Sequence, residues 1–117
     1  MEHSEIIKLT KKRLSNIKLI SSKLNENKKK LEEVEALGAD KDYINKLNFE
    51  IIKYERELRH IKNAMEPLKE RERKIIALNL FEKVAMKDIA SLINIRPKRV
   101  GQIKKKALET IADILYG

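Results

Sequence analysis

The sequence lacks several features, and each absence excludes a class of protein. It has no cysteine, which excludes a disulfide framework and a thiolate metal site. Its three glycines and two prolines are too few for the turns of a β-sandwich or barrel. Its apolar runs reach only three or four residues, whereas a membrane span needs about 20. The polar residues 1–5 are followed by no apolar stretch, so no signal peptide is expected.

Catalytic groups are also scarce. The only histidines are His3, near the chain end, and His60, within a charged stretch. No glycine-rich phosphate loop is present, and neither histidine has a partner at metal-ligand spacing. The carboxylates alternate with Lys and Arg, as on a solvated helix face. We therefore expect no enzyme activity, no cofactor and no metal.

The chain is instead rich in positive charge. Its 117 residues, about one domain's worth, include 27 Lys and Arg against 18 Asp and Glu, for a net charge of +9. Together with the absences above, this predicts an all-α, soluble, cytoplasmic protein with no membrane partner.

Residues 5–37 repeat apolar side chains mostly at steps of three and four, which predicts one long helix. Thr10, Arg13 and Asn27 interrupt this stripe. Gly38-Ala39-Asp40 then predicts a tight turn, with Gly38 at a helix end and Asp40 capping the next helix. Residues 41–65 carry a heptad seam, formed by Ile44, Leu47, Ile51, Tyr54, Leu58, Ile61 and Met65.

Residues 1–66 are therefore predicted to form a long antiparallel coiled-coil hairpin. A lone hairpin would leave apolar flanks exposed, so we expect self-association, as a homodimer through these N-terminal helices. The flanking residues are Leu14, Leu19, Tyr43 and Ile52.

Residues 67–117 are predicted to be a small helix-turn-helix bundle. Pro67 ends the long helix, because the residue before a proline avoids the helical region. Helices are expected at about 68–80, 86–93 and 97–115. Ala90 is the small residue where two helices touch, and Asn94 tolerates the positive φ of the turn. The apolar side chains placed to fill the junction are Ile89, Ile93, Ile95, Val100 and Ile103.

The charge distribution favours a helix-turn-helix that binds nucleic acid over a plain three-helix bundle with a tight turn. Between Met86 and Leu108 there are seven cations and one anion, so +6 of the chain's +9 lies within 23 residues. Val100, Ile103, Ala107 and Leu108 are expected to face inward, whereas Lys104 is expected to be a solvated surface residue. Arg99 and Gln102 suit base edges, and Lys87, Lys105 and Lys106 suit phosphates. The predicted DNA-binding set is Lys87, Arg96, Lys98, Arg99, Gln102, Lys105 and Lys106.

Four stretches resemble region 4 of the sigma-70 family: LKERERKII at 68–76, FEKVAMKDIA at 81–90, IRPKRV at 95–100 and Ala107-Leu108. The resemblance implies a helix-turn-helix that reads the promoter −35 element, with Arg96, Lys98, Arg99 and Gln102 near DNA. Lys83 stands where the family usually has glycine, and Ala85 and Arg96 stand where it has capping serines. Nothing before Pro67 resembles sigma region 2.

The helical N-terminal half followed by such a module is similar to small phage late-gene regulators of the ArpU/RinA kind. The sequence thus predicts a regulator of transcription that binds specific double-stranded DNA and is encoded by a phage or prophage. Two alternatives remain open at this point. One is a DNA-packaging protein like a phage small terminase subunit, and the other is a non-enzymatic adaptor that binds RNA polymerase.

Overall fold

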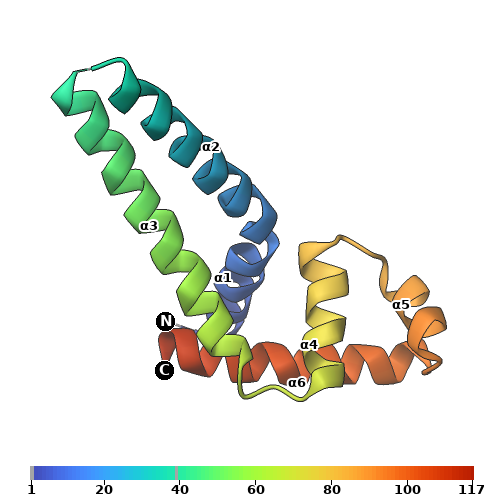
Figure 1. Ribbon diagram of the computed structural model, residues 1–117. Helices are drawn as coiled ribbons and strands as arrows, with labels where there is room; N and C mark the ends of the chain where they lie inside the picture. The colour runs from blue at the N-terminus through green and yellow to red at the C-terminus, as the bar shows by residue number, and fades with distance from the viewer. Residues whose placement is uncertain (1, 39) are drawn as a thin grey trace. The chain divides into compact units, whose positions relative to one another are not determined.

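The computed structural model describes residues 2–38 and 40–117, and every regular element in them is helical (Figure 1). This confirms the predicted all-α class. The chain divides into two compact units: one is Ile17–His60, and the other joins the segment up to Asn16 with Ile61–Gly117. The elements are α1 (His3–Ser15), α2 (Ile17–Ala36), α3 (Lys41–Met65), α4 (Glu70–Ile76), the π-helical turn η1 (Ala77–Phe81), α5 (Met86–Ile93) and α6 (Pro97–Tyr116).

The unit Ile17–His60 is an antiparallel hairpin of α2 and the larger part of α3, which run side by side (Figure 1). Leu47 and Ile51 of the heptad seam are buried, as predicted. Gly38 has a φ of +68°, and the Asp42 N–H donates to Oδ1 of Asp40 at 3.2 Å. The predicted turn chemistry is therefore confirmed at these two positions, while Ala39 lies outside the described residues.

Asn27, expected only to interrupt the apolar stripe, is 7% exposed within this hairpin. Its Nδ2 donates to Oε2 of Glu50 on the facing helix at 2.9 Å. A partly buried polar pair favours the one alignment of two helices in which its hydrogen bond can form. Asn27 therefore contributes to the register of the hairpin.

The prediction of one helix over residues 5–37 is wrong, because the chain breaks at Asn16. Asn16 has φ −91° and ψ 0°, and its N–H is shared between the carbonyls of Lys12 and Arg13. Asparagine is a weak helix former. The helix before the break, α1, belongs to the compact unit that also contains Ile61–Gly117. Leu14 was expected to be exposed but is fully buried there. Thr10 is also fully buried, and its Oγ1 donates to the Ile6 carbonyl at 2.8 Å.

The second unit is organised around α6, which contacts α1, α4 and α5. Its helix-turn-helix core confirms the predicted junction and adds Ile75 from α4. Asn94 adopts the left-handed conformation, with φ 56° and ψ 48°. The Ile95 N–H donates to the Ala90 carbonyl at 3.0 Å and closes the turn. The buried core is formed by Ile75, Ile89, Ala90, Val100 and Ile103.

The helix that follows Pro67 has different bounds from those that the sequence predicts. The helix expected over 68–80 begins at Glu70 and ends in a π-helical turn that reaches Phe81. The compact units divide at Asn16 and Ile61, and a functional division between residues 66 and 67 remains a prediction. The unit that carries the helix-turn-helix therefore includes α1 and the last turn of α3.

Lys83 has a φ of 60°, a conformation that costs an L-residue about 1–2 kcal/mol. Its Nζ donates to the Ser15 carbonyl at the end of α1, at 2.8 Å. Both Lys83→Gly and Lys83→Ala remove this bond, but only glycine relieves the backbone. We expect the glycine variant to be the more stable of the two by about 1 kcal/mol in urea unfolding.

The matched control is Lys74, an exposed residue in α4. There the order should reverse, with Lys74→Ala more stable than Lys74→Gly by about 1 kcal/mol. Equal stabilities for the two Lys83 variants would contradict a strained backbone at that position.

Candidate nucleic-acid interface

The two helices of the motif begin without side-chain caps. Ala85 and Arg96 occupy the N-cap positions of α5 and α6 in extended conformation, and neither side chain makes a capping hydrogen bond. Pro97 is at the start of α6, where its fixed φ suits the first turn. The expected departures from the family's capping serines therefore lie at the two helix starts.

α6 presents two different faces. Val100, Ile103, Ala107 and Leu108 are buried, as predicted. All seven predicted DNA-binding residues are exposed, one on α5 and the others at or after the start of α6. The DNA-binding role of these residues remains a prediction, but none of them is hidden in the fold. They are Lys87, Arg96, Lys98, Arg99, Gln102, Lys105 and Lys106.

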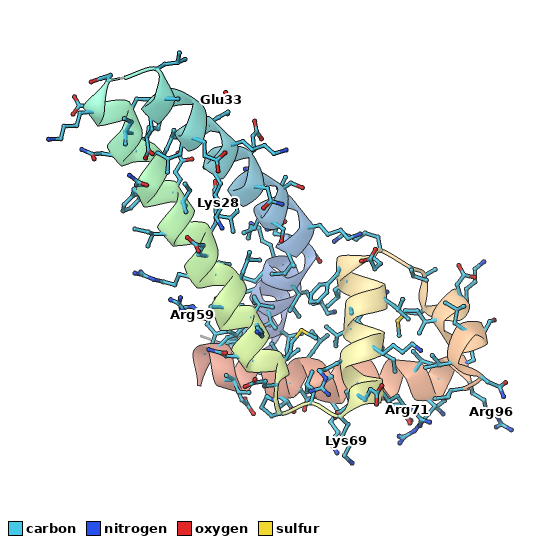
Figure 2. All side chains as sticks on the ribbon, viewed as in Figure 1. Lys28, Glu33, Arg59, Lys69, Arg71 and Arg96 are labelled. Carbon is cyan, nitrogen blue, oxygen red and sulfur yellow. The ribbon has the colours of Figure 1, made fainter. Side chains whose placement is uncertain are left out.

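Three of the seven, Arg99, Gln102 and Lys106, line one open pocket of about 510 Å³. Its other wall is the start of α4, with Lys69 and Arg71. Figure 2 shows the side chains of Lys69 and Arg71 pointing outward from that end of α4. We name this surface the α4 flank of α6.

Lys69 and Arg71 are absent from the predicted set, because cations that alternate with carboxylates before Met86 have the pattern of a solvated helix face. The signal was present in the sequence, since both residues lie within the 68–76 stretch that carries the resemblance. At the N-cap position, the Lys69 N–H donates to Oε1 of Glu72 at 2.9 Å. This bond fixes the first turn of α4 and leaves the side chains of Lys69 and Arg71 exposed.

Lys105 lies apart from this group and lines a second pocket, on the opposite side of α6. Lys104 lines it too, and is half-buried there, which differs from the expected solvated surface position. Burial lowers the pKa of the Lys104 ammonium, and the nearby positive charge of Lys11 lowers it further. Arg96, Lys98 and Lys87 line neither pocket.

No cluster of three or more metal-ligating side chains occurs among residues 2–38 and 40–117. In the same described ranges, no helix is long and apolar enough to cross a membrane.

Residues 64–113 match the family model of Sigma-70, region 4. These residues form a sigma-70 region 4-like helix-turn-helix. The match contains α4 to α5 and most of α6, and thus the whole junction described above. Neither the search of curated proteins nor the search of solved structures found a significant match.

Sigma region 4 is a non-catalytic domain that binds DNA and RNA polymerase, and this likeness supports a DNA-binding role in transcription regulation. The departure at Lys83 also has a structural meaning. The family's usual glycine suits the positive φ that this position adopts here.

Arg96 supplies a prediction for the region 4 segment. A cation at a helix N-terminus opposes the helix dipole, and serine is a better N-cap than arginine. Arg96→Ser should therefore raise the free energy of unfolding by about 0.5–2 kcal/mol and weaken duplex DNA binding. Urea unfolding and a binding titration on the same variant test both effects. An unchanged DNA affinity would remove Arg96 from the interface.

Proposed function

We propose that the protein is a transcriptional regulator that binds specific sites on double-stranded DNA through residues 67–117. The observation that carries this is the exposed cationic side of α6 in a region 4-like helix-turn-helix. The first turns of such a helix enter the major groove. DNA in the cytoplasm is the partner, with no cofactor or metal involved.

Within this interface, Arg99 and Gln102 are the proposed base readers. Arginine can donate two hydrogen bonds to a guanine edge, and glutamine pairs with an adenine edge. Both side chains are exposed and line the α4 flank. Lys87, Lys105 and Lys106 are proposed to bind phosphates, which orient the protein without reading sequence. Arg96 and Lys98 lie at the beginning of α6, and we propose that each contacts one or the other strand of the duplex.

The test begins with selection of bound duplexes from a random library, using the full chain. On the selected site, Gln102→Ala should cost about 1–3 kcal/mol and relax the preference at one base pair. Lys106→Ala is the matched contrast from the same pocket. It should weaken binding about equally on all sequences. If Gln102→Ala leaves the selected sequence unchanged, Gln102 is not a base reader.

The hairpin unit is proposed to join two copies of the chain. Leu19, Phe49 and Ile52 are 54%, 71% and 57% exposed in this unit, so each presents apolar surface that a second copy could cover. A homodimer would hold two recognition helices on half-sites about one DNA turn apart or a multiple of it. Sedimentation should give the mass of two chains, and the selected sites should be palindromic.

Other results of these experiments would select the alternatives. A ring of eight or more chains would favour a DNA-packaging protein of the small terminase kind. RNA polymerase binding without a shift of any duplex would favour an adaptor. The helical N-terminal half with a region 4-like module supports our assignment to phage or prophage regulators of the ArpU/RinA kind.

A further inference from the structure

The second pocket on α6, like the first, is lined by more cations than anions. It is an open pocket of about 540 Å³ between α1 and α6. Among the described residues that line it, four are lysines and one is a glutamate. Two lysines come from each helix, and the pairs are far apart in the sequence. They are Lys8 and Lys11 of α1, and Lys104 and Lys105 of α6.

The fold holds these like charges together at a cost. Lys104 is half-buried, so its ammonium loses part of its hydration. The charge of Lys11 acts on it in the same direction, and the two effects lower the pKa of Lys104. A bound anion would offset both costs, because it is attracted to every ammonium around the pocket.

Gly101 provides a second, independent observation. It lines the same pocket, and a Cβ built on it would meet no atom within 4 Å. Glycine is a poor helix former, and packing inside the protein does not require it at this position. Its absent side chain leaves the α6 backbone open to close approach by an external group.

The position of the pocket on α6 indicates which anion fits. Arg99, Gln102 and Lys106 lie on one side of the helix, and Gly101, Lys104 and Lys105 lie on the other by the 3.6-residue repeat. A helix inserted in the major groove lies between two sugar-phosphate strands. With α6 docked in this way, each of the two pockets would face one strand.

We propose that Lys8 and Lys11 of α1, together with Lys104 and Lys105, bind backbone phosphates of one DNA strand. This is the strand on the far side of α6 from the α4 flank. This inference rests on the proposed DNA-binding function and adds a partner surface outside the region 4 segment. It gives α1 a role in recognition as well as in packing. The ligand is the phosphodiester backbone, so these contacts add affinity without sequence preference.

The experiment measures the salt dependence of binding to the selected duplex with the full chain. Lys8→Gln and Lys11→Gln should each reduce the slope of log affinity against log salt by about 0.9. At 0.1 M salt that change corresponds to about eightfold weaker binding. The matched control is Lys12→Gln, since Lys12 is an exposed lysine of α1 that does not line the pocket. It should leave the slope unchanged.

Two further measurements separate contact from altered charge or folding. Ethylation of individual phosphates should reveal positions that impair binding of the wild type and of Lys12→Gln, but not of the Lys8→Gln/Lys11→Gln double variant. The melting temperature of Lys11→Gln should equal or exceed that of the wild type, because the substitution removes repulsion against Lys104.

The outcomes are distinguishable from failure of the proposed function. If the wild type binds no duplex, both proposals fall. If the wild type binds and Gln102→Ala impairs it, but Lys8→Gln and Lys11→Gln behave like Lys12→Gln, only this inference is overturned. A second result would also overturn it. In that case inorganic phosphate raises the melting temperature of the wild type but not of the Lys8→Gln/Lys11→Gln variant, while the two proteins have the same salt slope for DNA binding.

Discussion

Raising the salt concentration from 50 to 200 mM is expected to weaken binding to the selected duplex about 10²- to 10³-fold. The predicted interface holds six exposed cations. Arg99 is assigned to a base edge, so if four or five of the six neutralise phosphates, the slope of log affinity against log salt is about −3.6 to −4.5. The effect is large because each contact releases a condensed counterion from the duplex. The cations are Lys87, Arg96, Lys98, Arg99, Lys105 and Lys106.

Fluorescence anisotropy across a salt series measures this slope directly. Lys106→Ala should reduce the slope by about 0.9. Lys28 and Lys29 are exposed lysines on α2, in the other compact unit. Their double variant, Lys28→Gln/Lys29→Gln, should retain the wild-type slope although it loses two charges. Constant affinity over the salt range would refute a phosphate-dominated interface.

Local patterns were sufficient for much of this fold. The heptad seam predicted α3 with its observed ends, Lys41 and Met65, because a periodic stripe and a following proline are both local signals. Asn94 could be assigned its left-handed turn because few residue types adopt that conformation at low cost. The junction around Ala90 followed from the spacing of small and large side chains.

What the sequence could not provide depends on contacts between distant segments. The stripe of residues 5–37 continues across Asn16, so periodicity alone could not show that α1 packs on α6 rather than continuing α2. Thr10 and Asn27 were read as interruptions, because a polar side chain shows its hydrogen-bond partner only in three dimensions. Lys104 became half-buried for the same reason, since it lines the pocket between α6 and α1.

The candidate interface also combines features that local sequence predicts with features that depend on contacts between distant segments. The exposed side of α6 followed from helical periodicity and charge, which are properties of one segment. Lys69 and Arg71 approach α6 only because α4 packs on it. Their place beside Arg99 is a tertiary feature that charge counting within residues 86–108 could not include.

The junction that positions α6 should be very sensitive to truncation of Ile89. This side chain is fully buried in the core of the helix-turn-helix, against Val100 and Ile103. Ile89→Ala is expected to lower the free energy of unfolding by about 2–5 kcal/mol, since it removes apolar burial and leaves a cavity. Amide hydrogen exchange in α5 and α6 would measure the loss in the unit that binds DNA.

Leu92 provides the matched control on the same helix. It is 67% exposed, so Leu92→Ala should change the stability by less than about 0.5 kcal/mol. The two substitutions truncate side chains of similar size. A difference in their effects on stability therefore reports the burial of Ile89 at the junction. DNA affinity should follow stability for Ile89→Ala, because a recognition helix without a fixed tilt cannot match the groove. Equal exchange protection in both variants would show that Ile89 does not hold α5 against α6.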